Sequence, residues 1–168
     1  LASVSGCLEG PRVPVTATVI PIPTITSVTG NLVCESGSGT LSATPSSGVV
    51  NWYDSPSGGI MLATGNSFQT PSVNTTTTYY VDATFNGCTT ATRTPVTLSV
   101  QITPIPGANA NQEFCDIEQA TISNLSATGN SLKWYITSSG GIPANSTDLL
   151  TSRTYYVSQT INGCESIN

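Results

Sequence analysis

TYYVDATFNGC at residues 78–88 returns as TYYVSQTINGC at residues 154–164. In the first copy, Tyr79, Val81 and Ala83 alternate with more polar residues, a period of two that is typical of a β-strand with one face in a core. In each copy the final cysteine follows Asn-Gly, the residue pair preferred in a two-residue type I′ hairpin turn. The stretch therefore predicts, twice in one chain, a strand that turns back on itself immediately before a cysteine.

Other motifs repeat in the same order along the chain. They are Cys34 and Cys115, residues 41–44 and 125–128, Trp52-Tyr53 and Trp134-Tyr135, and residues 58–60 and 140–142. Recurrence in a fixed order indicates tandem structural repeats. We place the C-terminal strand of a preceding repeat at residues 1–20, a complete repeat (repeat 1) at residues 21–103, and a second repeat that lacks its last strand (repeat 2) at residues 104–168.

The two ends of this register leave two alternatives. Residues 8–19 have the sequence of a final strand without a sandwich of their own. Either the natural polypeptide continues in both directions, which we favour, or one chain donates this strand to the end of another. Between repeats, Pro-Ile-Pro at residues 21–23 and 104–106 predicts extended and stiff joints, because Pro fixes its own φ and restricts the residue before it.

Short alternating runs in both repeats are separated by Gly, Pro, Asn and Ser, which is typical of all-β sandwiches. Trp52 and, in the second copy, Trp134 and Ile136 share the parity of the apolar residues, so we expect them in the core. Asn51 and Lys133 lie on the opposite parity and should face solvent. The predicted fold is a series of tandem Ig-like β-sandwich repeats, with one disulfide in each repeat.

The chain has five cysteines, an odd number. The repeat register pairs Cys34 with Cys88 and Cys115 with Cys164, and it leaves Cys7 to a partner upstream. Each bridge would close a loop of about 55 residues and stabilise its repeat by roughly 4 kcal/mol on the chain-entropy model. Because Cys88 follows a hairpin turn, this pairing requires Cys34 to lie at the same end of the sandwich. Disulfides also indicate an oxidising location, outside the cell or on its surface.

Candidates for catalytic chemistry are few. The chain has no His, which removes the commonest general base and the commonest metal ligand. Two sets of carboxylates could hydrolyse glycosides but are better explained as surface charges: Asp54 with Asp82, and Glu113 with Asp116 and Glu118. Calcium at a joint could use Glu35 or Glu113, Asp116 and Glu118, but these have no Asp-x-Asp spacing. Lys133 has the solvent-facing parity, which argues against a buried isopeptide bond. We expect no enzyme activity, no catalytic residue, no cofactor and no metal.

The charge balance also limits the partners. Four Lys and Arg residues stand against nine Asp and Glu, and the cations are far apart in sequence, which argues against nucleic-acid binding. No apolar run approaches the roughly 18 residues of a membrane span, so we expect no direct membrane insertion. Four tyrosines are predicted outside the core and are candidates for surface contacts with sugars: Tyr53, Tyr80, Tyr135 and Tyr156.

Together, Leu-Ser-Ala-Thr, Trp-Tyr, Gly-Gly-Ile, Thr-Tyr-Tyr-Val and Asn-Gly-Cys resemble the Ig-like repeats of very large Bacteroidetes surface proteins. Those proteins include gliding-motility adhesins exported by the type IX secretion system. The resemblance covers nearly the whole chain and implies modules with no catalytic site of their own. It implies a structural and adhesive repeat segment that acts as a stiff extracellular spacer in adhesion or gliding motility.

The resemblance also implies a set of partners. These are neighbouring repeats of the same chain, and beyond them surface polysaccharide or other cell-surface proteins. Two alternatives remain for the function: a glycan- or protein-binding Ig-like module, and the accessory repeats of a secreted enzyme.

Overall fold

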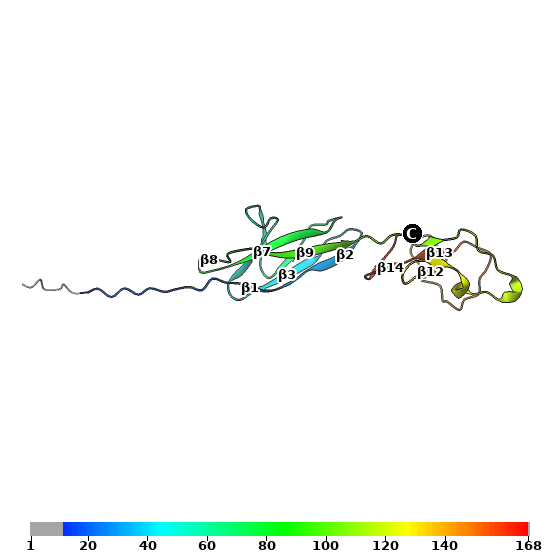
Figure 1. Cartoon of the computed structure of the whole chain (residues 1–168), viewed down its shortest axis with the longest axis horizontal. Helices are drawn as coiled ribbons and strands as arrows, with labels where there is room; N and C mark the ends of the chain where they lie inside the picture. The colour runs from blue at the N-terminus through cyan, green and yellow to red at the C-terminus, as the bar shows by residue number, and fades with distance from the viewer. Residues whose placement is uncertain (1–11, 168) are drawn as a thin grey trace, which may run out of the picture.

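The computed structural model of this chain describes residues 12–167, and the structural statements below concern those residues. Two bodies lie end to end along one axis, with residues 12–20 leading into the first of them (Figure 1). The first body holds strands β1 to β9 of repeat 1, and the second holds β10 to β15 of repeat 2. A strand was expected at residues 1–20, and its first part, together with Cys7, lies outside the described residues. Residues 12–20 form no strand.

Repeat 1 is a sandwich of two sheets. Its strands are β1 (Ile25–Thr29), β2 (Asn31–Cys34), β3 (Thr40–Pro45), β4 (Val49–Tyr53), β5 (Met61–Thr64), β6 (Ser67–Gln69), β7 (Thr77–Phe85), β8 (Cys88–Thr89) and β9 (Thr94–Gln101). One sheet has the order β1-β3-β6, and the other has the order β2-β9-β7-β4-β5 with β8 beside β7. The chain begins in the first sheet and crosses to the second, where β2 runs parallel to β9. The predicted all-β sandwich is confirmed.

Trp52 is central to the core of repeat 1, as predicted. Its side chain is fully buried, its ring centroid lies 5.5 Å from that of Phe68, and its Nε1 donates to the carbonyl of Gly65 at 2.8 Å. The remaining core residues come from both sheets: Leu41, Ala43, Val50, Tyr79, Val81, Val96 and Leu98. The indole N–H is therefore satisfied inside an apolar core, as a buried donor must be.

Both Asn-Gly pairs form the predicted hairpin turns. Asn86 and Gly87 have φ angles of 48° and 83°, and Asn162 and Gly163 have 51° and 81°. Two consecutive positive φ angles are required in a type I′ turn, and Gly and Asn adopt them at the least cost. The turns join β7 to β8 in repeat 1 and β14 to β15 in repeat 2.

Repeat 2 has the same order of motifs but less regular structure. Its elements are β10 (Gly107–Ala108), η1 (Asp116–Glu118), η2 (Ile122–Asn124), β11 (Ala127–Thr128), β12 (Lys133–Tyr135), β13 (Tyr156–Ser158), β14 (Thr160–Ile161) and β15 (Cys164–Glu165). The strands form three separate pairs, β10 with β11, β12 with β13, and β14 with β15. No strand equivalent to β9 occurs among its described residues. In repeat 1, β7 is paired with β9 on one side and with β4 on the other. In repeat 2, β13 is paired on one side only, with β12.

The absent neighbour changes which side chains of repeat 2 are covered. Trp134, expected in the core, is only half-buried, and Ile136, also expected there, is 51% exposed. Tyr135, predicted to lie outside, is 7% exposed. The alternation predicted for this strand is therefore wrong. The space that β9 fills in repeat 1 is open beside Trp134, while the hydroxyl of Tyr135 is hydrogen-bonded to Glu165 of the last hairpin.

Candidate functional site: the bridged joint between the repeats

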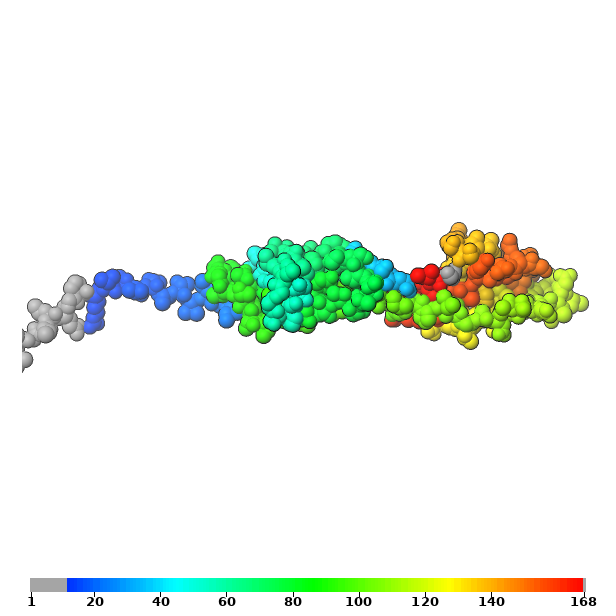
Figure 2. All heavy atoms as spheres, turned by 90° about the horizontal axis from the view of Figure 1, so that it is seen from above, coloured from blue at the N-terminus to red at the C-terminus, as the bar shows by residue number. Residues whose placement is uncertain are grey.

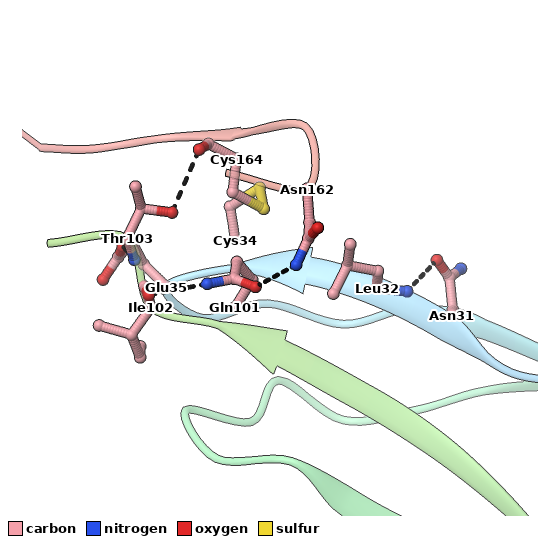
Figure 3. Close-up of a disulfide and its surroundings, with 9 residues drawn as sticks. All are labelled: Asn31, Leu32, Cys34, Glu35, Gln101, Ile102, Thr103, Asn162 and Cys164. Carbon is pink, nitrogen blue, oxygen red and sulfur yellow. Dashed lines mark hydrogen bonds between the residues drawn. A yellow bond between two sulfur atoms is a disulfide. The ribbon is translucent and has the colours of Figure 1, made fainter. Parts of the chain in front are cut away.

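A disulfide crosses the joint between the two repeats (Figure 3). It bonds Cys34 at the end of β2 to Cys164 at the start of β15, with the Cα atoms 5.3 Å apart and 130 positions between them in sequence. Cys88 and Cys115 are free thiols. The predicted pairs, Cys34 with Cys88 and Cys115 with Cys164, are therefore wrong. The bridge joins repeat 1 to repeat 2 and closes neither repeat on itself.

Strand direction explains this pairing. Because β2 runs parallel to β9, Cys34 lies opposite Gln101, where the chain leaves repeat 1. Cys88 lies opposite Phe85 at the hairpin turn, and Figure 1 shows β8 and β2 at opposite ends of repeat 1. The prediction that Cys34 and Cys88 share one end of the sandwich is thus also wrong. The last hairpin of repeat 2 points back toward repeat 1 and brings Cys164 to Cys34 (Figure 3).

Thr103 connects the two repeats beside the disulfide and is 5% exposed. Its N–H donates to Oε1 of Glu35 at 3.0 Å, and its Oγ1 donates to the carbonyl of Cys164 at 3.1 Å (Figure 3). The N–H of Glu35 in turn donates to the carbonyl of Gln101 at 2.9 Å. Thr103 is therefore hydrogen-bonded to both repeats, and Glu35, which the sequence offered only as a possible calcium ligand, accepts one of these bonds.

Amide side chains add further bonds at the joint. Asn162 Nδ2 donates to Gln101 Oε1 at 2.9 Å, and Gln159 Nε2 donates to the carbonyl of Pro104 at 2.7 Å. Gln159 is 5% exposed, and its backbone N–H and C=O are both bonded to Ser166. The exposed bond from Asn162 crosses the joint, whereas the bonds of Gln159 hold the start of repeat 2 to its last hairpin. Bending the joint would break the bond between buried Thr103 and Cys164, and an unpaired buried group costs about 1–3 kcal/mol.

This arrangement can carry mechanical load. The bridge closes a loop across 130 positions, which stabilises the folded pair by about 5 kcal/mol on the chain-entropy model. Cys164 is 1% exposed whereas Cys34 is exposed, so a thiol reductant would reach the bond through the Cys34 sulfur. While the disulfide is intact, the two repeats cannot separate at this point.

Arg93 packs over Tyr53, one of the four tyrosines predicted to contact sugars. Its guanidinium carbon lies 3.3 Å from the centroid of the Tyr53 ring, and Nη1 donates to the carbonyls of Ser55 and Gly58 at 2.7 Å. Its Nε pairs with Asp82 at 3.5 Å. Asp82 is 5% exposed, so its prediction as a solvated surface charge is wrong. One face of Tyr53 is occupied by the cation and is closed to a stacked sugar.

In repeat 2 a carboxylate replaces that arrangement. Glu165 accepts hydrogen bonds from Nζ of Lys133 at 2.7 Å and from the hydroxyls of Ser158 and Tyr135. The hydrogen bond from Lys133, followed by those from Ser158 and Tyr135, lowers the pKa of Glu165 from its usual 4.5 to about 2. Sequence reasoning missed Glu165, whose one signal is its place directly after the repeated cysteine. Of the four predicted surface tyrosines, Tyr135 is thus committed to this cluster.

We expect the Glu165 cluster to make stability depend on pH. The folded-state pKa lies below the unfolded one, so the stabilisation is present above pH 4.5 and is lost as pH falls toward 2. Glu165 is 34% exposed, and after allowance for solvent screening we expect it to contribute about 1–2 kcal/mol. Glu165→Gln should remove this acid dependence in urea unfolding measured between pH 2 and 7. The exposed Glu113→Gln serves as control, and an equal flattening in both variants would contradict the assignment.

The other predicted carboxylates do not gather into a site. Asp54 Oδ1 accepts from the N–H of Ile60 at 2.8 Å, and Glu118 Oε2 accepts from the N–H of Cys115 at 3.1 Å. Both bonds hold local turns. Within residues 12–167, no group of three or more Cys, Asp or Glu side chains is placed to hold a metal ion. Tyr80 and Tyr156 are half-buried and keep part of their surface available.

Comparison with known proteins gives one family. The sequence profile described as "Ig-like domain CHU_C associated" matches the chain twice, over residues 22–104 and over residues 103–168. A search of curated proteins finds no match. Domains of this family are typically non-catalytic, and with the disulfide they indicate an extracellular or surface protein. In the described part of the chain, no helix is long and apolar enough to cross a membrane.

Proposed function

Because this chain belongs to the CHU_C-associated family of Ig-like domains, found as repeats in Bacteroidetes-type surface proteins, we propose that it is a stiff extracellular spacer. In this role it holds a distant binding region away from the cell, in adhesion or in gliding motility, and transmits force along the repeat axis. Its chemistry is structural and it catalyses no reaction. Its working partners are neighbouring repeats of the same polypeptide.

The observation that carries the proposal is the joint. Two repeats that lie end to end are connected by a covalent bridge from Cys34 to Cys164 and by a buried residue, Thr103, that is hydrogen-bonded on both sides. A flexible tether would have an exposed linker rich in Gly and Ser, whereas this linker contains Pro104 and Pro106. A stiff joint lets reach grow in proportion to the number of repeats.

Residual dipolar couplings test this stiffness. In the native chain, one alignment tensor should fit the couplings of both repeats, because the bridged joint holds them in one orientation. In Cys34→Ser the bridge is absent, and the couplings of repeat 2 should shrink and require a tensor of their own. Cys88→Ser removes a thiol that is not bonded and should behave as the native chain does. Two independent tensors in the oxidised native chain would contradict a spacer function.

A binding module is the second candidate, favoured by the part-exposed Tyr80 and Tyr156. Surface polysaccharide or another cell-surface protein would then contact the repeats themselves. A glycan array probed with the full chain separates the two functions. The spacer proposal expects no glycan to be retained and no difference for Tyr80→Ala. Retention that is lost in Tyr80→Ala would favour the binding module.

A further inference from the structure

The disulfide at the joint is accessible from one of its two ends. Cys34 lies at the end of β2, an edge strand of its sheet, and is exposed, whereas Cys164 is 1% exposed. Figure 2 shows the end of β2 (light blue) beside the last hairpin (red) at the narrow waist between the repeats. Exchange with a thiol depends on which sulfur the thiol reaches. The sulfur that is attacked is therefore that of Cys34, and the sulfur that leaves is that of Cys164.

Hydrogen bonds beside the bridge hold Cys164 in place on repeat 1. The Oγ1 of Thr103 donates to the carbonyl of Cys164 at 3.1 Å, and the N–H of Thr103 donates to Glu35 of repeat 1. Asn162, in the same hairpin as Cys164, donates to Gln101 at the end of β9. These bonds connect the hairpin to the strand ends of repeat 1 (Figure 3). They favour the geometry in which the two sulfurs meet, whether or not the sulfurs are bonded.

We propose that Cys34 is a site of thiol exchange, at which a small-molecule thiol opens the joint and from which Cys164 closes it again. The thiol is a monothiol such as glutathione, and it becomes bonded to Cys34 as a mixed disulfide. The joint then has two covalent states, bridged and thiolated, and the concentration of thiol in the surroundings sets their proportion. Thiol exchange at Cys34 does not depend on the spacer function, which the dipolar couplings of the oxidised chain test separately.

The exchange needs no further oxidant or reductant. The small thiol loses its proton, and its thiolate attacks Sγ of Cys34. A bond forms between these two sulfurs, the bond from Cys34 to Cys164 breaks, and its electron pair leaves on Cys164, which takes up the proton. Closure is the reverse reaction, in which the thiolate of Cys164 attacks Cys34 and releases the small thiol. In each direction one disulfide is consumed and one is formed.

The side of attack makes the opening reversible. A small thiol bonded to Cys34 lies at the exposed edge of repeat 1 and leaves the hairpin of Cys164 unmodified. The same group on Cys164 would have to fit where that residue is 1% exposed, and it would hold the hairpin away from repeat 1. Thiolation at Cys34 therefore opens the joint without blocking its closure.

Peptide mapping after a brief exposure to reduced glutathione tests the side of attack. Every protein carries Cys7→Ser, Cys88→Ser and Cys115→Ser, so that only the bridged pair can react. Exchange is stopped with acid and the chain is digested at low pH, where the thiols carry no charge and do not react. We expect glutathione on the Cys34 peptide in at least about tenfold excess over the Cys164 peptide. Equal adducts on the two peptides would overturn the proposal, as would a bridge that glutathione opens only in the unfolded chain.

A matched pair of variants at Thr103 tests closure. The bridged joint makes the bond from Thr103 to Cys164 and the opened joint does not, so loss of this bond weakens the bridged state alone. In glutathione redox buffers, Thr103→Val should lower the equilibrium constant for closure at least about fivefold, because a buried carbonyl loses its donor. Thr103→Ser keeps the hydroxyl and should stay within about twofold of the native value. Equal constants for the two variants would overturn the proposed closure.

Discussion

Reduction of the Cys34–Cys164 bridge should lengthen the fully unfolded chain by about 450 Å when it is pulled from its two ends. While the bond is intact, load passes from Cys34 directly to Cys164, and the chain across 130 positions bears none of it. An extended chain spans at most about 3.3–3.6 Å per residue, which gives this hidden length. Optical tweezers can measure the final contour length with and without a reductant. The gain should appear as one step for each molecule.

Substitution of single cysteines makes this measurement specific. Cys34→Ser should have the long contour without any reductant, whereas Cys88→Ser should behave as the native chain does, because Cys88 is free. If each repeat were closed by its own disulfide, reduction would instead release two shorter lengths, each of about 190 Å or less. Two such steps would contradict a bridge across the joint.

Trp52→Ala should unfold most of repeat 1. Trp52 is fully buried and contacts Phe68 in the core, and truncation of a buried Trp costs about 3–5 kcal/mol. A module of about 80 residues has a total stability of roughly 4–12 kcal/mol, so this loss is a large share of it. Amide hydrogen exchange of β7 should accelerate greatly in the variant. Trp52→Phe, which keeps most of the volume but loses the bond to Gly65, should give an intermediate rate.

The matching Trp of repeat 2 provides the control. Trp134 is only half-buried and borders an open space, so Trp134→Ala should cost about 1–2 kcal/mol, mostly from lost apolar burial. Exchange of β13 should therefore accelerate far less in Trp134→Ala than exchange of β7 does in Trp52→Ala. Equal costs at the two positions would show that repeat 2 has a closed core.

Local pattern was enough to predict much of repeat 1. Alternation around Val81 predicted a strand, found as β7 (Thr77–Phe85), and Asn86-Gly87 predicted the turn that ends it. These predictions succeed because period and turn chemistry are properties of neighbouring residues. The same reasoning failed for Asp82 and Tyr135. Parity assigns a residue to a face of a sheet, but it does not say that Arg93 or the last hairpin will cover that face.

The cysteine pairing was not accessible from the repeat register. Each of the two repeats carries one cysteine 11 to 13 positions after the first Pro of its Pro-Ile-Pro joint, and the other directly after its Asn-Gly turn. The register therefore fits a bond within a repeat and a bond between adjacent repeats equally well. The choice depends on which end of the sandwich each cysteine occupies. That end is fixed by the parallel pairing of β2 with β9, which joins residues distant in sequence.

Peptide mapping under non-reducing conditions, with free thiols alkylated first, tests the central claim most directly. We expect one fragment that joins the Cys34 peptide to the Cys164 peptide, and alkylated Cys88 and Cys115 in the monomer. Fragments that join Cys34 to Cys88 and Cys115 to Cys164 would contradict a bridged joint. Such fragments would show that each repeat is closed by its own disulfide and that only the Pro-Ile-Pro linker connects the two repeats.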